Sequence, residues 1–178
     1  MSEIESKAQA GGESGEEALS LDYSVQRHLG PKEFQDILCA ALEGGIGYWA
    51  CLDNGTEAWK RARAQLAEEL KGLPEPWMRV PTYDQIAARV LRNGDAVLFA
   101  DAEEESESVP EELEWRLTAP ALVAAAKRFQ EERTAELRRR GGPLALYDLA
   151  AELDGGDFDA DDADAVIQYA LFGELVYG

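Results

Sequence analysis

Residues 41–49, Ala-Leu-Glu-Gly-Gly-Ile-Gly-Tyr-Trp, mark a change from helix to strand. Gly44 is expected to take the left-handed conformation that ends the helix, and residues 46–52 to follow as a strand. Glycine-rich phosphate loops lead from a strand into a helix, so the opposite order here favours a helix stop. Pro31 suits the first turn of this helix, and apolar side chains upstream of the glycines share one helix face: Phe34, Ile37, Leu38, Ala41 and Leu42.

The remaining sequence predicts five more helices and two more strands. Thr82 and Gln85 form a capping-box pattern, and Asp161 or Asp162 is expected to cap the last helix. The order of elements predicts an α+β fold, with about six helices covering a small, largely antiparallel sheet of about three strands. Residues 21–178 are expected to form one domain, and residues 1–20 a disordered acidic tail. Helices are expected over 56–71, 82–92, 118–140, 144–153 and 163–172, and strands over 96–100 and 113–117.

The net charge of −19 is concentrated in three segments. Residues 1–20, 101–114 and 152–164 together carry 20 acids and one base, whereas the remaining sequence carries 16 of each. A field of this sign repels a phosphate backbone, so direct nucleic-acid binding is not expected. The acidic segments are instead expected to meet a protein with a basic surface.

Two segments resemble a group of small proteins encoded by phages and prophages. One is Ile37-Leu38-Cys39-Ala40-Ala41-Leu42-Glu43-Gly44-Gly45-Ile46-Gly47-Tyr48-Trp49, and the other runs from Asp161 through Asp-Ala-Asp-Ala-Val-Ile-Gln-Tyr-Ala-Leu-Phe-Gly-Glu-Leu-Val-Tyr to Gly178. The resemblance brackets about residues 34–178 and implies an accessory gene product of a phage or integrated element. It implies no catalytic residues.

Charge and resemblance together predict a non-enzymatic protein that binds a host or phage protein through its acidic loops or an exposed aromatic surface. The most concrete version is counter-defence, in which the protein imitates nucleic acid and occupies a basic groove. Confinement of the acids to flexible-looking segments counts partly against a rigid mimic. The candidate binding residues are the acids of two predicted loops: Glu103, Glu104, Glu105, Glu107, Asp157, Asp159 and Asp161.

Two alternatives stay open on the sequence. The first is a small enzyme or ligand-binding protein with a pocket near Glu43, Tyr48 and Trp49. The second is a structural phage component, for which a defined homo-oligomer would be evidence. The sequence does not predict the oligomeric state.

The sequence offers little support for a metal site, a cysteine nucleophile, or a membrane or secreted location. The aspartates of 154–164 lack the Gly and Glu of an EF-hand loop at its sixth and twelfth positions, where Asp162 and Gln168 stand, and His28 is the single histidine. We therefore expect no metal site beyond weak divalent binding, and no cofactor. A nucleophilic pair of Cys39 or Cys51 with His28 is not required by any spacing. Apolar runs shorter than about 18 residues, the lack of a signal peptide and two cysteines predict a protein of the host cytoplasm.

Overall fold

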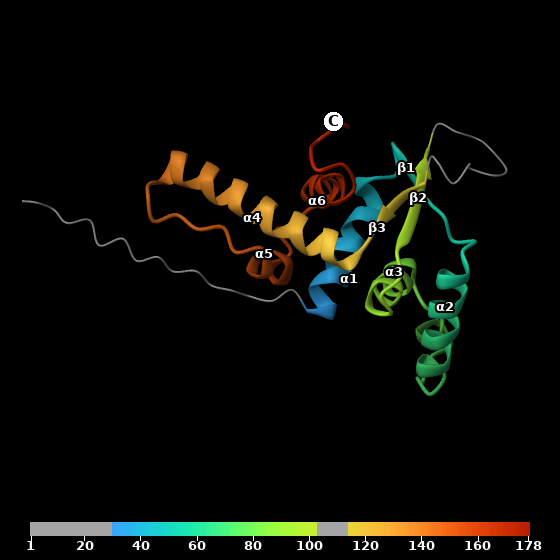
Figure 1. Ribbon diagram of the computed structural model, residues 1–178. Coiled ribbons are helices and arrows are strands. Elements are labelled where there is room, and N and C mark those ends of the chain that lie inside the picture. The colour runs from blue at the N-terminus through green and yellow to red at the C-terminus, as the bar shows by residue number, and fades with distance from the viewer. Residues whose placement is uncertain (1–29, 103–113) are drawn as a thin grey trace, which may run out of the picture.

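A helix that runs into a π turn lies at the centre of the fold (Figure 1). The computed structural model describes residues 30–102 and 114–178. Helix α1, Pro31–Ala40, continues into η1, Ala41–Gly45, where Ile46 N donates to Ala41 O at 3.0 Å. Helix α3 packs against α1, and α6 packs against η1. The α2–α3 pair and the α4–α6 pair thus join through this central segment.

The other elements complete an α+β fold, as the sequence predicts. Their order in the sheet is β1-β2-β3, antiparallel throughout, with Phe99 opposite both Leu52 and Trp115. The buried apolar residues from the helices and the sheet form one core, which fits a single domain. The elements are β1 (Ala50–Leu52), α2 (Glu57–Leu70), the 3-10 turn η2 (Pro76–Arg79), α3 (Tyr83–Arg92), β2 (Val97–Asp101), β3 (Trp115–Leu117), α4 (Ala119–Gly141), α5 (Leu149–Gly155) and α6 (Ala160–Phe172).

Helices α2 and α3 begin one residue after their predicted starts, because Thr56 and Thr82 are their N-cap residues. Thr56 Oγ1 accepts a hydrogen bond from Trp59 N at 3.1 Å, and Gln85 Oε1 accepts one from Thr82 N at 3.1 Å. Such caps satisfy backbone N–H groups that lack a partner within the helix. Trp59 and Ala62 of α2 are buried, as are Ile86, Ala87, Val90 and Leu91 of α3, whereas Leu66 and Leu70 of α2 are half-buried.

The predicted helix stop at Gly44 and the strand from Ile46 are wrong. Positive φ angles occur, among the described residues, at Gly94, Gly142, Gly156 and Gly173, so Gly44 is not left-handed. The helix continues in π register through Gly45. A turn follows, in which Trp49 N and Ala50 N both donate to Ile46 O, and this turn delays the strand to Ala50.

The predicted helix over 144–153 starts late, at Leu149. Side chains of α4 take up the backbone groups of the preceding segment: Thr134 Oγ1 accepts from Tyr147 N at 3.1 Å, and Gln130 Oε1 accepts from Leu149 N at 3.3 Å. These tertiary hydrogen bonds replace the local ones that a helix would make. Asp148 then caps α5.

The predicted cap of the last helix also differs. Asp159, not Asp161 or Asp162, caps α6, since its Oδ1 accepts from Asp162 N at 3.0 Å. The predicted disordered tail over 1–20 and most of the acidic segment 101–114 lie outside the described residues.

Gly45 is required by the close approach of η1 to α6. A Cβ at Gly45 would lie 2.6 Å from Ala160 O, whereas one at Gly47 would meet no heavy atom within 4 Å. We predict that Gly45→Ala lowers the free energy of unfolding by about 1–3 kcal/mol, because the two backbones must separate. The matched Gly47→Ala should change it by less than about 0.5 kcal/mol. Urea unfolding measures both, and equal effects would contradict this role of Gly45.

Candidate functional site

Tyr48 and Trp49 turn toward α6 rather than toward a pocket beside Glu43. Trp49 Nε1 donates to Asp164 Oδ1 at 2.7 Å, and Tyr48 OH donates to Asp164 Oδ2 at 3.1 Å. The Trp49 side chain is only 2% exposed. Trp49 is therefore a core residue, and Asp164 is its polar anchor.

The Trp49 ring is enclosed by aromatic side chains, a group that we call the aromatic clasp: Trp49, Trp115, Phe172 and Tyr177. Trp49 and Tyr177 stack with ring centroids 4.8 Å apart and an interplanar angle of 4°. Trp115 packs on Phe172 edge to face at 5.2 Å. Stacked and edge-to-face pairs of this kind add stability beyond the burial of apolar area.

Gln168 holds the Tyr177 end of the aromatic clasp in place by hydrogen bonds. Its Nε2 donates to Asp164 Oδ2 and to Tyr177 O, both at 2.9 Å, while its Oε1 accepts from Val176 N and Tyr177 N. This side chain is 1% exposed, and its amide oxygen and nitrogen both have partners. Asp164 thus connects α6 to Tyr48 and Trp49, and Gln168 connects Asp164 to the last residues of the chain.

Most acids of 152–164 have structural tasks, since α5 and α6 occupy most of this segment. Four of the seven do so: Asp154 pairs with Lys32, Asp159 caps α6, Asp162 pairs with Arg133, and Asp164 anchors Trp49. Asp157 and Asp161 are exposed and make none of these contacts. Of the seven candidate acids in the predicted loops, Glu103, Glu104, Glu105 and Glu107 lie outside the described residues.

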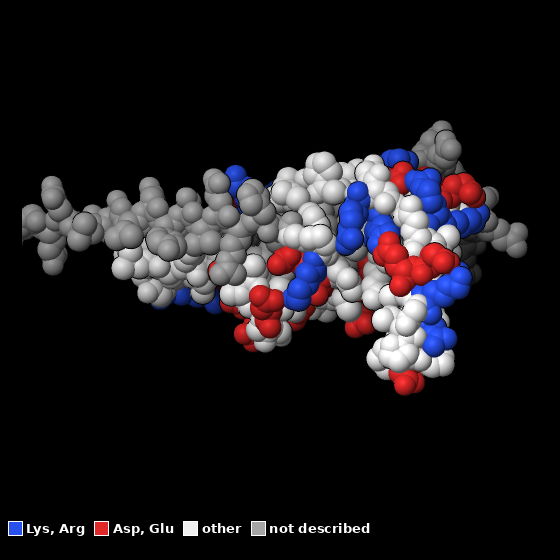
Figure 2. All heavy atoms as spheres, turned by 90° about the horizontal axis from the view of Figure 1, so that it is seen from below, with Lys and Arg blue, Asp and Glu red and all other residues white. Residues whose placement is uncertain are grey.

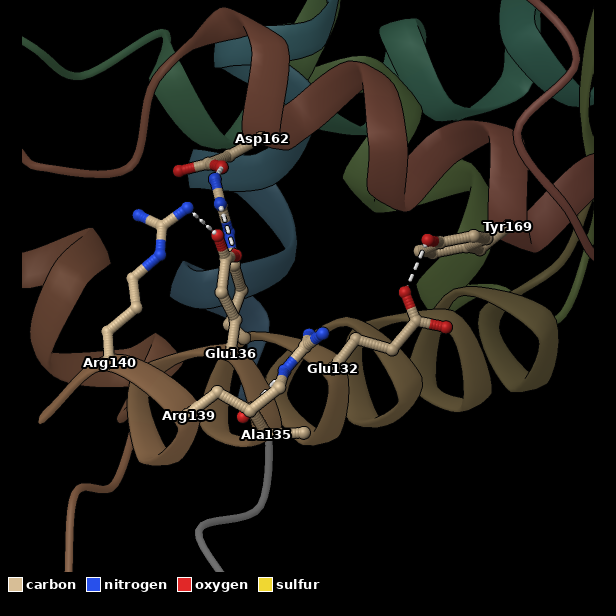
Figure 3. A network of polar contacts seen from close by, with 8 residues as sticks. Glu132, Ala135, Glu136, Arg139, Arg140, Asp162 and Tyr169 are labelled. Atoms are coloured by element: carbon tan, nitrogen blue, oxygen red, sulfur yellow. Dashed lines mark hydrogen bonds and ion pairs between the residues drawn. The ribbon is translucent and has the colours of Figure 1, made fainter. Parts of the chain in front are cut away.

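A network of polar contacts joins α4 to α6 (Figure 3). Glu132 accepts a hydrogen bond from the Tyr169 hydroxyl, and this bond, helped by Arg128, lowers the pKa of Glu132. Arg128 also lies over the Tyr169 ring, 4.3 Å from its centroid. The i,i+4 spacing of Arg128 and Glu132 was a readable signal, whereas the partner on α6 was not. The network stabilises helix packing.

Glu43 lines a pocket of about 470 Å³ between the end of the central helix, β1 and the first turn of α3. Cys39 and Asp84 share this lining, but Tyr48 and Trp49 do not belong to it. The structure therefore separates the three residues predicted to form one pocket. Sequence reasoning missed Asp84, because its approach to Glu43 depends on the packing of α3 against α1.

Cys39 is held as a neutral thiol. Burial, together with the charges of Asp84 and Glu43, raises the pKa of Cys39 to about 11. A cysteine nucleophile needs the opposite shift, toward a thiolate at neutral pH. His28, the other member of the proposed pair, lies outside the described residues.

Over 30–102 and 114–178, His, Cys, Asp and Glu side chains do not gather in threes that could hold a metal ion. In the same ranges, none of the helices combines the length and apolar character needed to cross a bilayer.

Comparison of the chain with protein-family models, with curated proteins and with solved structures found no match.

Removal of the Asp164 carboxylate should destabilise the protein. We predict that Asp164→Ala lowers the free energy of unfolding by about 1–3 kcal/mol, because Trp49 Nε1 and the Gln168 amide lose their acceptor. Asp161→Ala, an exposed site one turn earlier on the same helix, is the control and should cost less than about 0.5 kcal/mol. Urea unfolding, followed by the near-ultraviolet circular dichroism of the aromatic side chains, reports the outcome, and equal losses would contradict the anchor role.

Alkylation rates test the state of Cys39. With a pKa of about 11, roughly one thiol in a thousand is ionised at pH 8, so iodoacetamide should label the exposed Cys51 well before Cys39. Labelling of Cys39 should rise about tenfold per pH unit between pH 8 and 10. Peptide mass spectrometry measures both sites, and the urea-unfolded chain, in which both should react alike, is the control. Fast labelling of Cys39 at pH 7 in the folded protein would contradict the neutral thiol.

Proposed function

We propose that this chain is a non-enzymatic interaction protein of a phage or mobile element, which binds a basic surface on a host or phage protein. The observation that supports it most is the internal pairing of the basic side chains. At least nine of the 15 described Lys and Arg residues form ion pairs with acids of the same chain. Most basic side chains of the described residues are therefore already paired, and few remain within the chain to neutralise the other carboxylates.

The unmatched charge is divided between two parts of the sequence. The described residues hold 15 bases and 24 acids, a net charge of −9, and the other residues hold two bases and 12 acids, a net charge of −10. Figure 2 shows acidic and basic side chains intermingled on one face of the described part. Segment 103–113, with six acids and no base, is accordingly the leading electrostatic contact in this proposal.

An exposed apolar stretch supports protein binding independently of charge. Trp77 is 70% exposed, Val80 62% and Tyr83 56%, and the three lie between η2 and the first residue of α3. Large exposed apolar side chains that lie together commonly mark interaction surfaces, and Trp and Tyr are frequent anchors at such surfaces.

The most concrete form of the proposal is counter-defence inside the host cell. In that form the basic surface is one that would otherwise hold nucleic acid. Asp159, Asp162 and Asp164 are bound up in the fold, so segment 152–164 contributes mainly Asp157 and Asp161. Steering by such charges raises the association rate and is screened by salt.

A second candidate function rests on the pocket beside Glu43. Its volume of about 470 Å³ lies in the range that holds small ligands, which favours a ligand-binding protein. The raised pKa of Cys39 disfavours a cysteine nucleophile in this pocket, and Glu43 is the carboxylate on which an enzymatic alternative would rest.

Neutralising the acids of segment 103–113 should abolish partner capture. The test variant carries Glu103→Gln, Glu104→Gln, Glu105→Gln and Glu107→Gln. The control carries four neutralised acids on exposed framework positions, Glu57, Glu68, Glu75 and Glu131, so both variants have the same net charge of −15. We expect affinity capture from the host at low salt to lose the partner with the test variant and to keep it with the control.

Salt dependence gives the second readout of this experiment. Capture by the wild-type chain should weaken steeply as ionic strength rises from 50 to 500 mM, because exposed charges are screened. Equal capture by wild type and test variant, or capture that does not respond to salt, would overturn the proposed function.

A further inference from the structure

The pocket beside Glu43 joins apolar and acidic lining in one place. Leu42, Ile46 and Leu52 supply apolar side chains, while Glu43 and Asp84 supply carboxylates. The lining contains no Lys, Arg or His. Within the described residues, neither carboxylate forms an ion pair, although Gln35 Nε2 donates to Asp84 Oδ2 at 2.9 Å.

Both carboxylates act on the same part of the pocket. Burial raises the pKa of Cys39, and the charges of Asp84 and Glu43, which line the same pocket, raise it further. One acid comes from the π turn after α1 and the other from the first turn of α3, and the packing of α3 against α1 brings them together. π turns inside helices are frequent at functional sites, and here the turn carries Glu43.

These features select the chemistry of an occupant. An anion would be repelled by the two acids, and a neutral apolar group would cover them without offering a donor. A basic side chain meets both needs, because its methylene stem covers apolar lining while its charged end stays at the carboxylates.

Arginine fits better than lysine. Tyr83 lines the pocket. Its ring packs against Trp59, with centroids 5.7 Å apart. The residue is still 56% exposed, which leaves ring surface to stack with a planar guanidinium. The guanidinium also presents several N–H donors, which suits two acceptors from different elements. We propose that this pocket receives an arginine side chain of the partner's basic surface, an inference that rests on the proposed function.

The direct test uses a peptide probe rather than the partner. Acetyl-Leu-Arg-amide is titrated into the ¹⁵N-labelled full chain at low salt, beside the same peptide with citrulline, the neutral isostere of arginine. We expect millimolar binding of the arginine peptide, with amide shifts at Cys39, Gly47 and Asp84, and binding of the citrulline peptide at least tenfold weaker.

Two variants of the pocket test separately whether peptide binding needs its two carboxylates and whether it needs its open volume. Glu43→Gln with Asp84→Asn should weaken the arginine peptide about tenfold, whereas Asp157→Asn with Asp161→Asn, which removes the same charge elsewhere, should not. Gly47→Leu adds a side chain where a Cβ meets no heavy atom within 4 Å, so it should block the peptide with an unchanged thermal unfolding midpoint.

Equal binding of the arginine and citrulline peptides would indicate an apolar occupant and overturn the inference. Amide shifts confined to residues away from the pocket would also overturn it, as would unweakened binding by the Glu43→Gln, Asp84→Asn variant. If the Gly47→Leu variant does not bind the peptide but still captures the partner at wild-type strength, the pocket has no role in partner binding. The proposed function would then still stand. If the arginine peptide binds but affinity capture finds no partner whose binding depends on salt, the guanidinium site is supported and the proposed function is overturned.

Discussion

The close contact between η1 and α6 at Gly45 is the constraint on which the rest of the structure depends. Any side chain there would meet Ala160 O, at 2.6 Å from its Cβ, so glycine alone allows the approach. The approach places Asp164 where Trp49 Nε1 can donate to it, and Trp49 then stacks on Tyr177. Since α1 also packs against α3, one contact orders both pairs of helices around the centre.

The same contact determines where recognition can occur. A strand starting at Ile46 would have placed side chains alternately on two faces. The π turn instead adds a residue to the last helical turn, and the backbone bonds to Ile46 O then set the direction of Tyr48 and Trp49. Glu43 is left on the other side, beside Asp84. A structural face and a candidate recognition face thus arise from nine consecutive residues.

Local patterns were sufficient to predict the helices but not their irregular neighbours. The amphipathic spacing and caps at Thr56 and Thr82 act within one element, so sequence alone reveals them. The extended segment before Leu149 depends on hydrogen bonds from α4, and these are tertiary. Gln168 was a usable signal that was missed: a polar residue in an otherwise apolar stripe must find partners when buried, and it finds the backbone at Tyr177.

The acids of this chain differ in what the fold leaves them free to do. Asp162 pairs with Arg133, and Asp164 accepts hydrogen bonds from Trp49 and Gln168, so internal contacts already occupy both carboxylates. Acids outside ion pairs can attract a basic group at two different distances. Exposed carboxylates attract a basic surface over a distance of about 8 Å at physiological salt, which mainly affects association. Carboxylates beside apolar lining, such as Glu43 and Asp84, act only at contact, where screening is weaker and dissociation is slowed. Attraction and retention would then lie in different parts of the molecule.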